Sequence, residues 1–326
     1  MSEAHSPRVS VIVPAYNKPE YLPECLRSVQ AQTFTDWECI VVNDGSPRAD
    51  EIRAAVAAMN DPRFRLVEHE KNLGPGAARN EGARSSRGAY LIFLDEDDKI
   101  SMNLVGALYE ALRDGLFDIA HPSATTFGGR SEKMITEVPD VSRSLRGQPL
   151  LGAGYMIAKT TFYQVGEYDE HPTLALGRED FEWWIRAIST GVRVSIIPEA
   201  TYFYRQPADV LDTSTSLNNA AKRHELRIRT YIVAKHRELY RTHGASRRRF
   251  LSGGWAAEAA AMKRNGEVGR SALLMWRAYL LYPDVQRLRR AVGLTVEAAV
   301  GPAVANALRR WWRSLNGEGK PGIVGR

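Results

Sequence analysis

Residues 9–98 alternate short β-branched runs with amphipathic stretches. The β-branched runs are typical of buried strands, and apolar residues recurring every three or four positions are typical of helices. The pattern predicts strands at 9–13, 38–44, 63–69 and 89–95, separated by helices at 19–30, 50–59 and 76–85. We therefore expect an α/β fold with a mostly parallel sheet, helices on both faces, and ligands beyond the carboxyl ends of the strands.

The remainder of the chain falls into two parts. In the less regular middle third, we predict strands at 118–123, 150–158 and 193–198 and a helix at 180–190. From residue 218 onward the pattern predicts helices alone, at 226–239, 250–262, 271–281 and 285–294. A boundary near residue 215 follows, with one domain at 1–215 and an all-helical appendage at 216–326.

The charges divide the chain at nearly the same place. The 326 residues hold 44 Lys and Arg against 38 Asp and Glu, a net charge of +6. Residues 1–218 hold 22 basic and 31 acidic side chains, so −9, whereas residues 219–326 hold 22 and 7, so +15. The two parts are electrostatically different.

The cysteines and the polar N-terminal residues favour one cellular compartment. The two cysteines, Cys25 and Cys39, lie in apolar periodic segments, which favours a packing role and a reducing environment. The first eight residues are polar and do not resemble a secretory leader, and Glu297 interrupts the apolar stretch 291–308. We expect a cytoplasmic protein without a membrane span.

Four consecutive carboxylates, residues 95–98 in LDEDD, follow the fourth predicted strand. Gathering that much negative charge is costly unless a cation or solvent compensates it. The alternative is a solvated turn, but four acids exceed what a turn needs. Oxygen ligands select Mg²⁺ or Mn²⁺ over zinc, so the motif favours a divalent metal site completed by substrate phosphates.

Two further motifs fall at the same predicted edge. Asp44 in VVNDGS ends the second strand, where it is either a turn residue or an acceptor for a nucleobase or ribose. NLGPGAARN at 72–80 opens a helix, and its glycines and free amides suit a phosphate. An ordinary glycine-rich helix start is the alternative, because neither Walker nor GxGxxG spacing is present.

Taken together, the motifs resemble a known family. They are VSVIVPAYN at 9–17, VVNDGS at 41–46, NLGPGAARN at 72–80, FLDEDD at 93–98, VGEYDE at 165–170 and GREDFEWWIRA at 177–187. In this order they resemble the inverting glycosyltransferase family two, whose GT-A fold is Rossmann-like. The resemblance runs through YFYR at 202–205 and implies that residues 1–215 bind a nucleotide sugar and carry out catalysis.

The resemblance implies roles for residues near the nucleotide and the metal. The matching residues are Pro14, Ala15 and Tyr16 in a turn against the nucleotide, Asp44 at the base or ribose, Arg79 near the nucleotide, and Asp95, Glu96 and Asp97 in the metal motif. Asp97 matches the direct metal ligand and Asp95 lies nearer the ribose. The implied cofactor is Mn²⁺ or Mg²⁺, and the implied donor is a nucleoside-diphosphate sugar, with UDP expected.

The resemblance also implies a catalytic base. Asp180 matches the carboxylate that deprotonates the acceptor hydroxyl, and Glu179 beside it is an acceptor-site candidate. The alternative is an acidic helix N-terminus with no catalytic role. Trp183 and Trp184 point in different directions, so one of them is a candidate for stacking on an acceptor sugar, with core packing of both as the alternative.

Departures from the family pattern narrow the expected reaction. Asn43 stands where the family often has a second Asp, and Glu96 stands where the metal motif often has a small residue. Gln206 and Pro207 follow YFYR where the family often has a metal-binding His, which leaves the third protein ligand open. The Gln-Arg-x-x-Arg-Trp signature of processive synthases is absent, so we expect a single transfer to a glycan or lipid-linked acceptor. The alternative is a catalytically silent member that binds a nucleotide sugar or a protein partner.

Arginine clusters mark the helical part, at 247–249, at 287–290 and in RRWWR at 309–313. Arginine-rich helices with tryptophan suit an anionic membrane surface, and a protein interface is an equal alternative. No nucleic-acid recognition motif accompanies the charge, so we do not expect nucleic acid as a partner. A position at the inner face of the membrane would place the enzyme beside lipid-linked acceptors.

Overall fold

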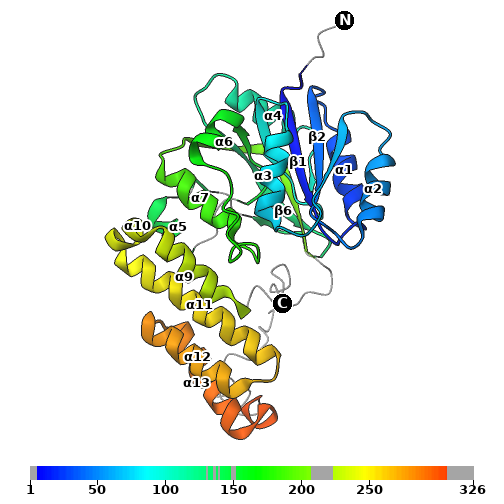
Figure 1. Ribbon diagram of the computed structural model, residues 1–326. Helices are drawn as coiled ribbons and strands as arrows, with labels where there is room; N and C mark the ends of the chain where they lie inside the picture. The colour runs from blue at the N-terminus through cyan, green and yellow to red at the C-terminus, as the bar shows by residue number, and fades with distance from the viewer. Residues whose placement is uncertain are drawn as a thin grey trace, which may run out of the picture. The chain divides into compact units, whose positions relative to one another are not determined.

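The computed structural model describes residues 6–129, 131–134, 137–138, 140–147, 152–206 and 223–306 (Figure 1). The chain forms two compact units, Met1–Asn218 and Asn219–Arg326. Each unit has its own core. Within the described residues, no helix combines the length and the apolar character that a membrane crossing requires.

Four parallel strands form the first half of the sheet, as predicted. They are β1 (Val9–Ala15), β2 (Trp37–Asn43), β3 (Phe64–Glu68) and β4 (Tyr90–Phe93), in the spatial order β3-β2-β1-β4. Val9 pairs with both Trp37 and Tyr90, so β1, β2 and β4 begin level with one another. Their carboxyl ends consequently share one edge of the sheet.

The second half of the sheet is mixed. Beyond β4 the order continues with β8 (Met156–Ala158), β6 (Ile119–Phe127), β9 (Val194–Arg205) and β5 (Lys99–Ile100), while β7 (Lys133–Met134) pairs with β6. β8 runs antiparallel to β4 and β6, whereas β6 and β9 are parallel. β9 extends seven residues beyond the predicted strand end at 198, because its far part pairs with β6 and β5.

Helices cover both faces of the sheet, as predicted for the GT-A fold. α1 (Leu22–Gln30), α2 (Ala49–Ala57) and α4 (Leu104–Leu112) pack on the face that receives Val9, Val11 and Val13. α3 (Pro75–Ser85), α6 (Lys159–Val165) and α7 (Glu179–Ser189) pack on the face that receives Ile12. The period-2 alternation of β1 therefore feeds two cores. α4, α6 and the short α5 (Val141–Leu145) were not predicted.

The second unit contains only helices among its described residues. They are α9 (Glu225–Lys235), α10 (Arg237–Thr242), α11 (Gly244–Arg264), α12 (Val268–Leu281) and α13 (Val285–Val300). The predicted helix 226–239 is divided at His236, and α11 begins earlier than predicted. One core cluster, rich in small side chains, consists of Ala259, Ala272, Met275, Ala278, Ala291 and Leu294. Larger apolar side chains of the same unit are buried as well, among them Ile228, Ile232, Tyr240 and Phe250. The RRWWR motif at 309–313 lies outside the described residues.

Replacing Gly82 should loosen α3 from the sheet. A Cβ at Gly82 would overlap Ile12 Cγ2, and Ile12 is a fully buried, β-branched side chain of β1. We expect Gly82→Ala to lower the free energy of unfolding by about 1–3 kcal/mol, the usual cost of overpacking. The matched control is Gly106→Ala in α4, where the new Cβ meets only Phe34 at an ordinary 3.5 Å. Urea unfolding of both variants measures the difference, and equal loss in the two would contradict the packing argument.

The buried His121 of β6 predicts a pH dependence of stability. Burial lowers the pKa of His121 to about 4, against 6.5 for an exposed imidazole. Between these values the unfolded chain binds a proton that the folded chain excludes, so stability falls as pH drops from about 6.5 to 4. The loss amounts to about 3 kcal/mol at pH 4. In His121→Gln, the free energy of unfolding measured with urea should no longer fall over this pH range. A dependence on pH equal to that of the wild type would contradict the role of His121.

Candidate active site

The carboxyl ends of β1, β2 and β4 bring three predicted motifs to one edge of the sheet. Asp44 directly follows β2, and its backbone N–H donates to Ala15 O at the end of β1, at 3.0 Å. The N–H of Leu94, beyond β4, donates to Ile12 O at 2.9 Å. The PAY turn, Asp44 and the acidic motif are therefore neighbours, as expected for a parallel sheet.

The acidic motif alternates between outward and inward side chains. The side chains of Asp95 and Asp97 are 33% and 26% exposed. Glu96 and Asp98 are buried. Asp98 accepts hydrogen bonds from the Tyr202 hydroxyl at 2.5 Å and from Arg205 N at 2.7 Å, and burial raises its pKa well above the ordinary value. Only Asp95 and Asp97 are left facing out.

Glu96 supports the turn after β1. Its Oε1 accepts a hydrogen bond from Tyr16 N at 2.9 Å, while its buried Oε2 has no partner. Burial raises the pKa of Glu96 to about 7 against the opposing effect of the Tyr16 N–H. Of the three residues predicted in a turn, Pro14 and Ala15 instead end β1, where Pro14 is partly buried and Ala15 is buried, and Tyr16 just beyond them is exposed. Of the three predicted nucleotide contacts, Tyr16 presents the largest free side chain.

A lysine lies beside the outward-facing carboxylates. Lys18 Nζ lies 2.6 Å from Asp97 Oδ2. Although burial lowers the pKa of Lys18, the charge of Asp97 raises it above the ordinary value. Asn17, just before it, has a left-handed backbone (φ 61°), and its N–H donates to Ser46 Oγ at 3.1 Å. Sequence reasoning did not single out Lys18, for which the only signal is its place after the PAYN turn.

Asp44 anchors the glycine-rich loop. Its buried carboxylate accepts hydrogen bonds from Leu73 N at 2.9 Å and Gly74 N at 2.8 Å, and it contacts His69 Nδ1 at 2.7 Å. Gly74 adopts φ 97°, a conformation that favours glycine. The structure thus gives Asp44 an architectural role that the sequence did not suggest, and its role toward a base or ribose stays a prediction.

The start of α3 packs closely on the start of α7. A Cβ at Gly74 would lie 2.9 Å from Ala175, and a Cβ at Gly76 would lie 3.3 Å from Tyr168 and 3.4 Å from Glu179. The glycines therefore permit close approach of two protein segments.

Arg79 joins the acidic motif to α7. Its guanidinium donates to Asp95 Oδ1 at 2.7 Å and to Glu179 Oε1 at 2.5 Å, and it lies 5.4 Å from the Tyr168 ring centroid. The Arg79 side chain is only 8% exposed. Burial works against the charge, yet Asp95 and Glu179 raise the pKa of Arg79 well above its ordinary value. The arginine stays charged and bridges two elements that are distant in sequence.

At the start of α7, the side chain of Asp180 is exposed to solvent and that of Glu179 is buried. Asp180 is exposed, and its Oδ1 accepts a hydrogen bond from Phe181 N at 2.6 Å. It lies close enough to Arg79 to raise the pKa of that guanidinium. Glu179 is buried against Arg79, so the prediction that it contacts the acceptor is corrected to a positioning role.

The prediction that a tryptophan of α7 stacks on an acceptor sugar is wrong. Trp183 and Trp184 are 0% and 1% exposed. Trp183 stacks on Tyr155 with ring centroids 5.4 Å apart, and Trp184 meets the same ring edge-on at 4.9 Å. The Trp183 indole N–H donates to Gly166 O at 2.9 Å. An aromatic cluster from several elements surrounds both rings, which leaves no face for a ligand.

No protein group in the described residues completes a metal site. No three His, Cys, Asp or Glu side chains there lie close enough together to hold a metal ion. Two outward carboxylates nevertheless fit Mg²⁺ or Mn²⁺, which commonly use one or two carboxylates and complete their shell with water and substrate phosphates. After YFYR, the N–H of Gln206 donates to Phe127 O, and Pro207 lies outside the described residues.

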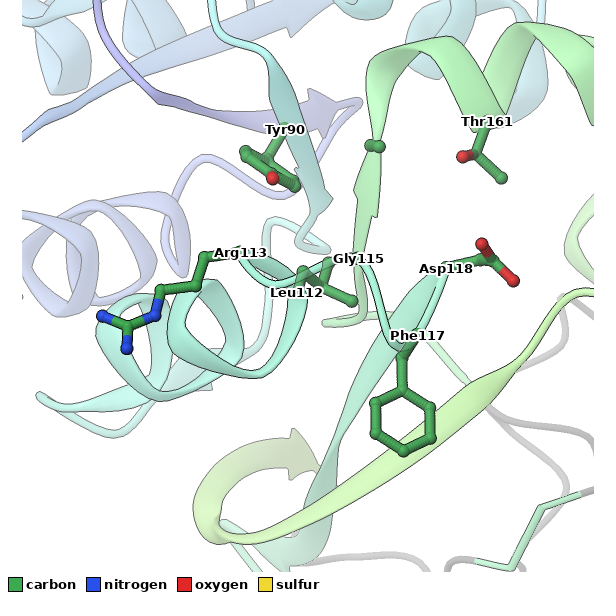
Figure 2. A pocket seen from close by; sticks show the side chains of 8 residues that line it. Tyr90, Leu112, Arg113, Gly115, Phe117, Asp118 and Thr161 are labelled. Carbon is green, nitrogen blue, oxygen red and sulfur yellow. The ribbon is translucent and has the colours of Figure 1, made fainter.

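Two cavities in the described residues lie elsewhere. Figure 2 shows one of about 210 Å³ bordered by Tyr90 at the start of β4, Asp118 just before β6 and Thr161 of α6. The other, of about 400 Å³, lies among α11, α12 and α13 and is lined in part by Met275 and Leu294. Neither cavity is lined by Asp95 or Asp97.

Two curated relatives show what this chain is similar to in sequence. EpsJ of Bacillus subtilis, described as an uncharacterized glycosyltransferase, is 42% identical over 114 residues, covering 35% of this chain and 33% of EpsJ. The succinoglycan biosynthesis protein ExoO of Rhizobium meliloti is 30% identical over 213 residues, covering 61% of this chain and 60% of ExoO. The chain thus spans about a third of EpsJ and three fifths of ExoO.

Solved structures share the fold. S. aureus TarS (1–349) in complex with UDP-GlcNAc superimposes with a TM-score of 0.55 at 17% identity, over 90% of this chain and 92% of TarS. The mannosyltransferase PcManGT from Pyrobaculum calidifontis, in complex with GDP-Man and Mn²⁺, gives 0.54 at 18% identity, over 95% and 88%. The family model of glycosyl transferase family 2 matches residues 10–180, a span that begins in β1 and ends at Asp180. With these motifs on a GT-A fold, the chain belongs to glycosyltransferase family 2.

Proposed function

We propose that this chain transfers one sugar from a nucleoside-diphosphate sugar to an acceptor hydroxyl, in a single displacement that inverts the anomeric centre. The observation that carries the proposal is the Arg79 bridge. It ties Asp95, at the end of β4, to the first turn of α7, where Asp180 is exposed. Outward carboxylates for the donor side and an exposed carboxylate for the acceptor side thereby belong to one rigid network.

Asp95 and Asp97 would hold the divalent cation, Mn²⁺ or Mg²⁺. Both offer hard oxygen ligands at the surface, and Asp97 already attracts the cationic Lys18. When bound, the metal would neutralise the charge that develops on the departing diphosphate. Lys18 then becomes free to turn toward solvent or phosphate.

On the donor side, the protein's contribution is mainly positioning. Glu96 holds the Pro14–Tyr16 turn against which the nucleotide would lie. Asp44 holds the glycine-rich loop, and an oxygen lone pair left on its carboxylate would accept from the base or ribose. Arg79 is buried between two acids, so it would act on the nucleotide through Asp95 rather than by direct contact.

On the acceptor side, Asp180 would take the proton of the attacking hydroxyl. It sits in the first turn of α7, where the helix dipole favours a negative charge, and its side chain is exposed to an incoming substrate. One displacement needs a base and a leaving group but no enzyme nucleophile, which agrees with the residues present.

The relatives offer some support for the proposed donor and acceptor classes, although the PcManGT complex holds GDP-Man instead of a UDP-sugar. The TarS complex with UDP-GlcNAc supports a UDP-linked donor, and the name of ExoO supports a glycan or lipid-linked acceptor in polysaccharide biosynthesis. The reaction would be non-processive, since the synthase signature is absent from the sequence. Lipid-linked acceptors would place the enzyme in the cytoplasm, at the inner face of the membrane. Residues 219–326 would hold it there by binding either an anionic membrane surface or a protein partner.

Asp180→Asn should abolish transfer without affecting donor binding. Loss of the base lowers kcat by about 10²–10⁴-fold, while the exposed position leaves the fold intact. Transfer is measured with a panel of nucleotide sugars and acceptors, and nucleotide affinity by calorimetry. Asp114→Asn, an exposed acid paired with Arg113, is the control and should keep full activity. Unchanged turnover in Asp180→Asn would overturn the assignment of the base.

Asp97→Asn should weaken metal-dependent nucleotide binding. Removing one of two carboxylate ligands should lower Mn²⁺ affinity by about tenfold or more and make the thermal shift caused by UDP insensitive to Mn²⁺. Electron paramagnetic resonance of free Mn²⁺ measures metal affinity directly. Asp118→Asn, which lies outside the acidic motif and pairs with Arg193, is the control. Wild-type Mn²⁺ affinity in Asp97→Asn would exclude Asp97 as a ligand.

A further inference from the structure

The turn between α12 and α13 carries exposed apolar side chains. α12 ends at Leu281 and α13 begins at Val285, so residues 282–284 join them in a tight hairpin. On either side of this turn, Leu280 is 72% exposed and Val285 is 64% exposed. We refer to residues 280–285 as the hairpin tip.

Exposed apolar residues are concentrated on this hairpin and just after it. Of the 16 large apolar side chains that are exposed in the described residues, seven lie between positions 273 and 304. They are Leu273, Leu280, Val285, Leu288, Val292, Val300 and Val304. Single exposed apolar residues are ordinary, but a concentration of them indicates an interaction surface.

Arginines accompany the apolar residues at matched spacing. Arg277 lies four residues after Leu273 and three before Leu280, and Arg289 lies four after Val285 and three before Val292. Residues at these separations share one side of a helix. The Trp276 indole N–H donates to Thr295 Oγ1 at 2.9 Å and holds the two helices side by side.

The arginines are set back from the tip by a short distance. With a rise of about 1.5 Å per residue, Arg277 lies about 4.5 Å along its helix from Leu280, and Arg289 about 6 Å from Val285. Interfacial helices bury their apolar side about 5–10 Å into the boundary between headgroups and acyl chains. An inserted tip would therefore bring both guanidinium groups to the level of the lipid phosphates.

Positive charge around the tip is poorly compensated. Among the described residues, Arg277, Arg289 and Arg290 form no ion pair, and the Arg277 guanidinium instead lies 5.3 Å from the Trp255 ring centroid. Arg287 pairs with Asp284. Burial, followed by the nearby Arg249, lowers the pKa of Arg287, with Arg290 contributing to the same effect. One acid thus faces several arginines, and an anionic partner would relieve their repulsion.

We propose that the hairpin tip inserts shallowly into an anionic membrane while Arg277 and Arg289 bind lipid phosphates. Charge complementarity favours this partner over a second copy of the chain, since two copies would oppose two regions of charge +15. The proposal does not depend on the transfer reaction, and it assigns the membrane contact to particular residues.

Vesicle sedimentation of the full chain tests the proposal. Wild type should pellet with phosphatidylcholine vesicles that contain phosphatidylglycerol, not with pure phosphatidylcholine, and salt should weaken the binding. Arg277→Gln with Arg289→Gln should lower affinity by about 25-fold, from about fivefold for each arginine. Leu280→Glu with Val285→Glu should lower it by about tenfold or more. Leu116→Glu, at a residue 66% exposed outside this unit, should bind like wild type.

A fluorescent label at a single position reports insertion of the hairpin tip directly, independently of the binding affinity. An environment-sensitive fluorophore on Val285→Cys should shift to the blue with anionic vesicles, whereas one on Leu116→Cys should not. The native Cys25 and Cys39 are buried and stay unlabelled. Wild-type binding by both double variants would overturn the proposal. So would equal non-binding to both vesicle types, a blue shift without vesicles, or self-association that the tip variants abolish.

Discussion

A buried arginine between two acids from distant elements holds the candidate site together. Arg79 sits in the middle of α3 and donates to Asp95 and Glu179 at once. Charged groups are removed from water at high cost unless they are paired, and loss of one partner of a buried pair typically costs about 3–5 kcal/mol. The same contact therefore makes the fold sensitive to the loss of either partner, and it ties Asp95 to the first turn of α7. Gly76, which lets α3 approach α7, is a condition for it.

Of the four carboxylates of the acidic motif, two are buried and support the backbone, and two are exposed to solvent. Asp98 is buried against Tyr202 and Arg205, and Glu96 holds the turn at Tyr16. These contacts fix the backbone of the motif, so that the alternate residues project outward. A site for a divalent cation needs such firmly held ligands, because small errors in ligand position weaken metal binding. The two buried acids thus support the backbone that presents Asp95 and Asp97.

Local patterns predicted the first half of the sheet well. In the second half they predicted strands at the places of β6, β8 and β9 but neither the short β5 and β7 nor the strand lengths and order. From β1 to β4, strands and helices alternate with clear periodicity, and neighbours in sequence are neighbours in space. Beyond β4, the order β8-β6-β9-β5 pairs segments far apart in the chain. The length of β9 depends on partners that its own residues do not reveal. Trp183 and Trp184 show the same limit, because the rings of Tyr155 and Phe162 enclose them from other elements.

The sequence by itself determined the order of motifs, the parallel core and the family, since each depends on residues close together in the chain. It also distinguished residues 1–218, with a net charge of −9, from residues 219–326, with a net charge of +15. Only the tertiary structure decided which acids of a motif face outward and that Arg79 reaches Glu179 one hundred positions later. It also decided that, in the part of the chain that the structure describes, Leu280 and Val285 are exposed at the hairpin tip. Burial and long-range pairing are properties of the packed chain, because whether a side chain meets water or a partner is settled by elements that lie far away in sequence.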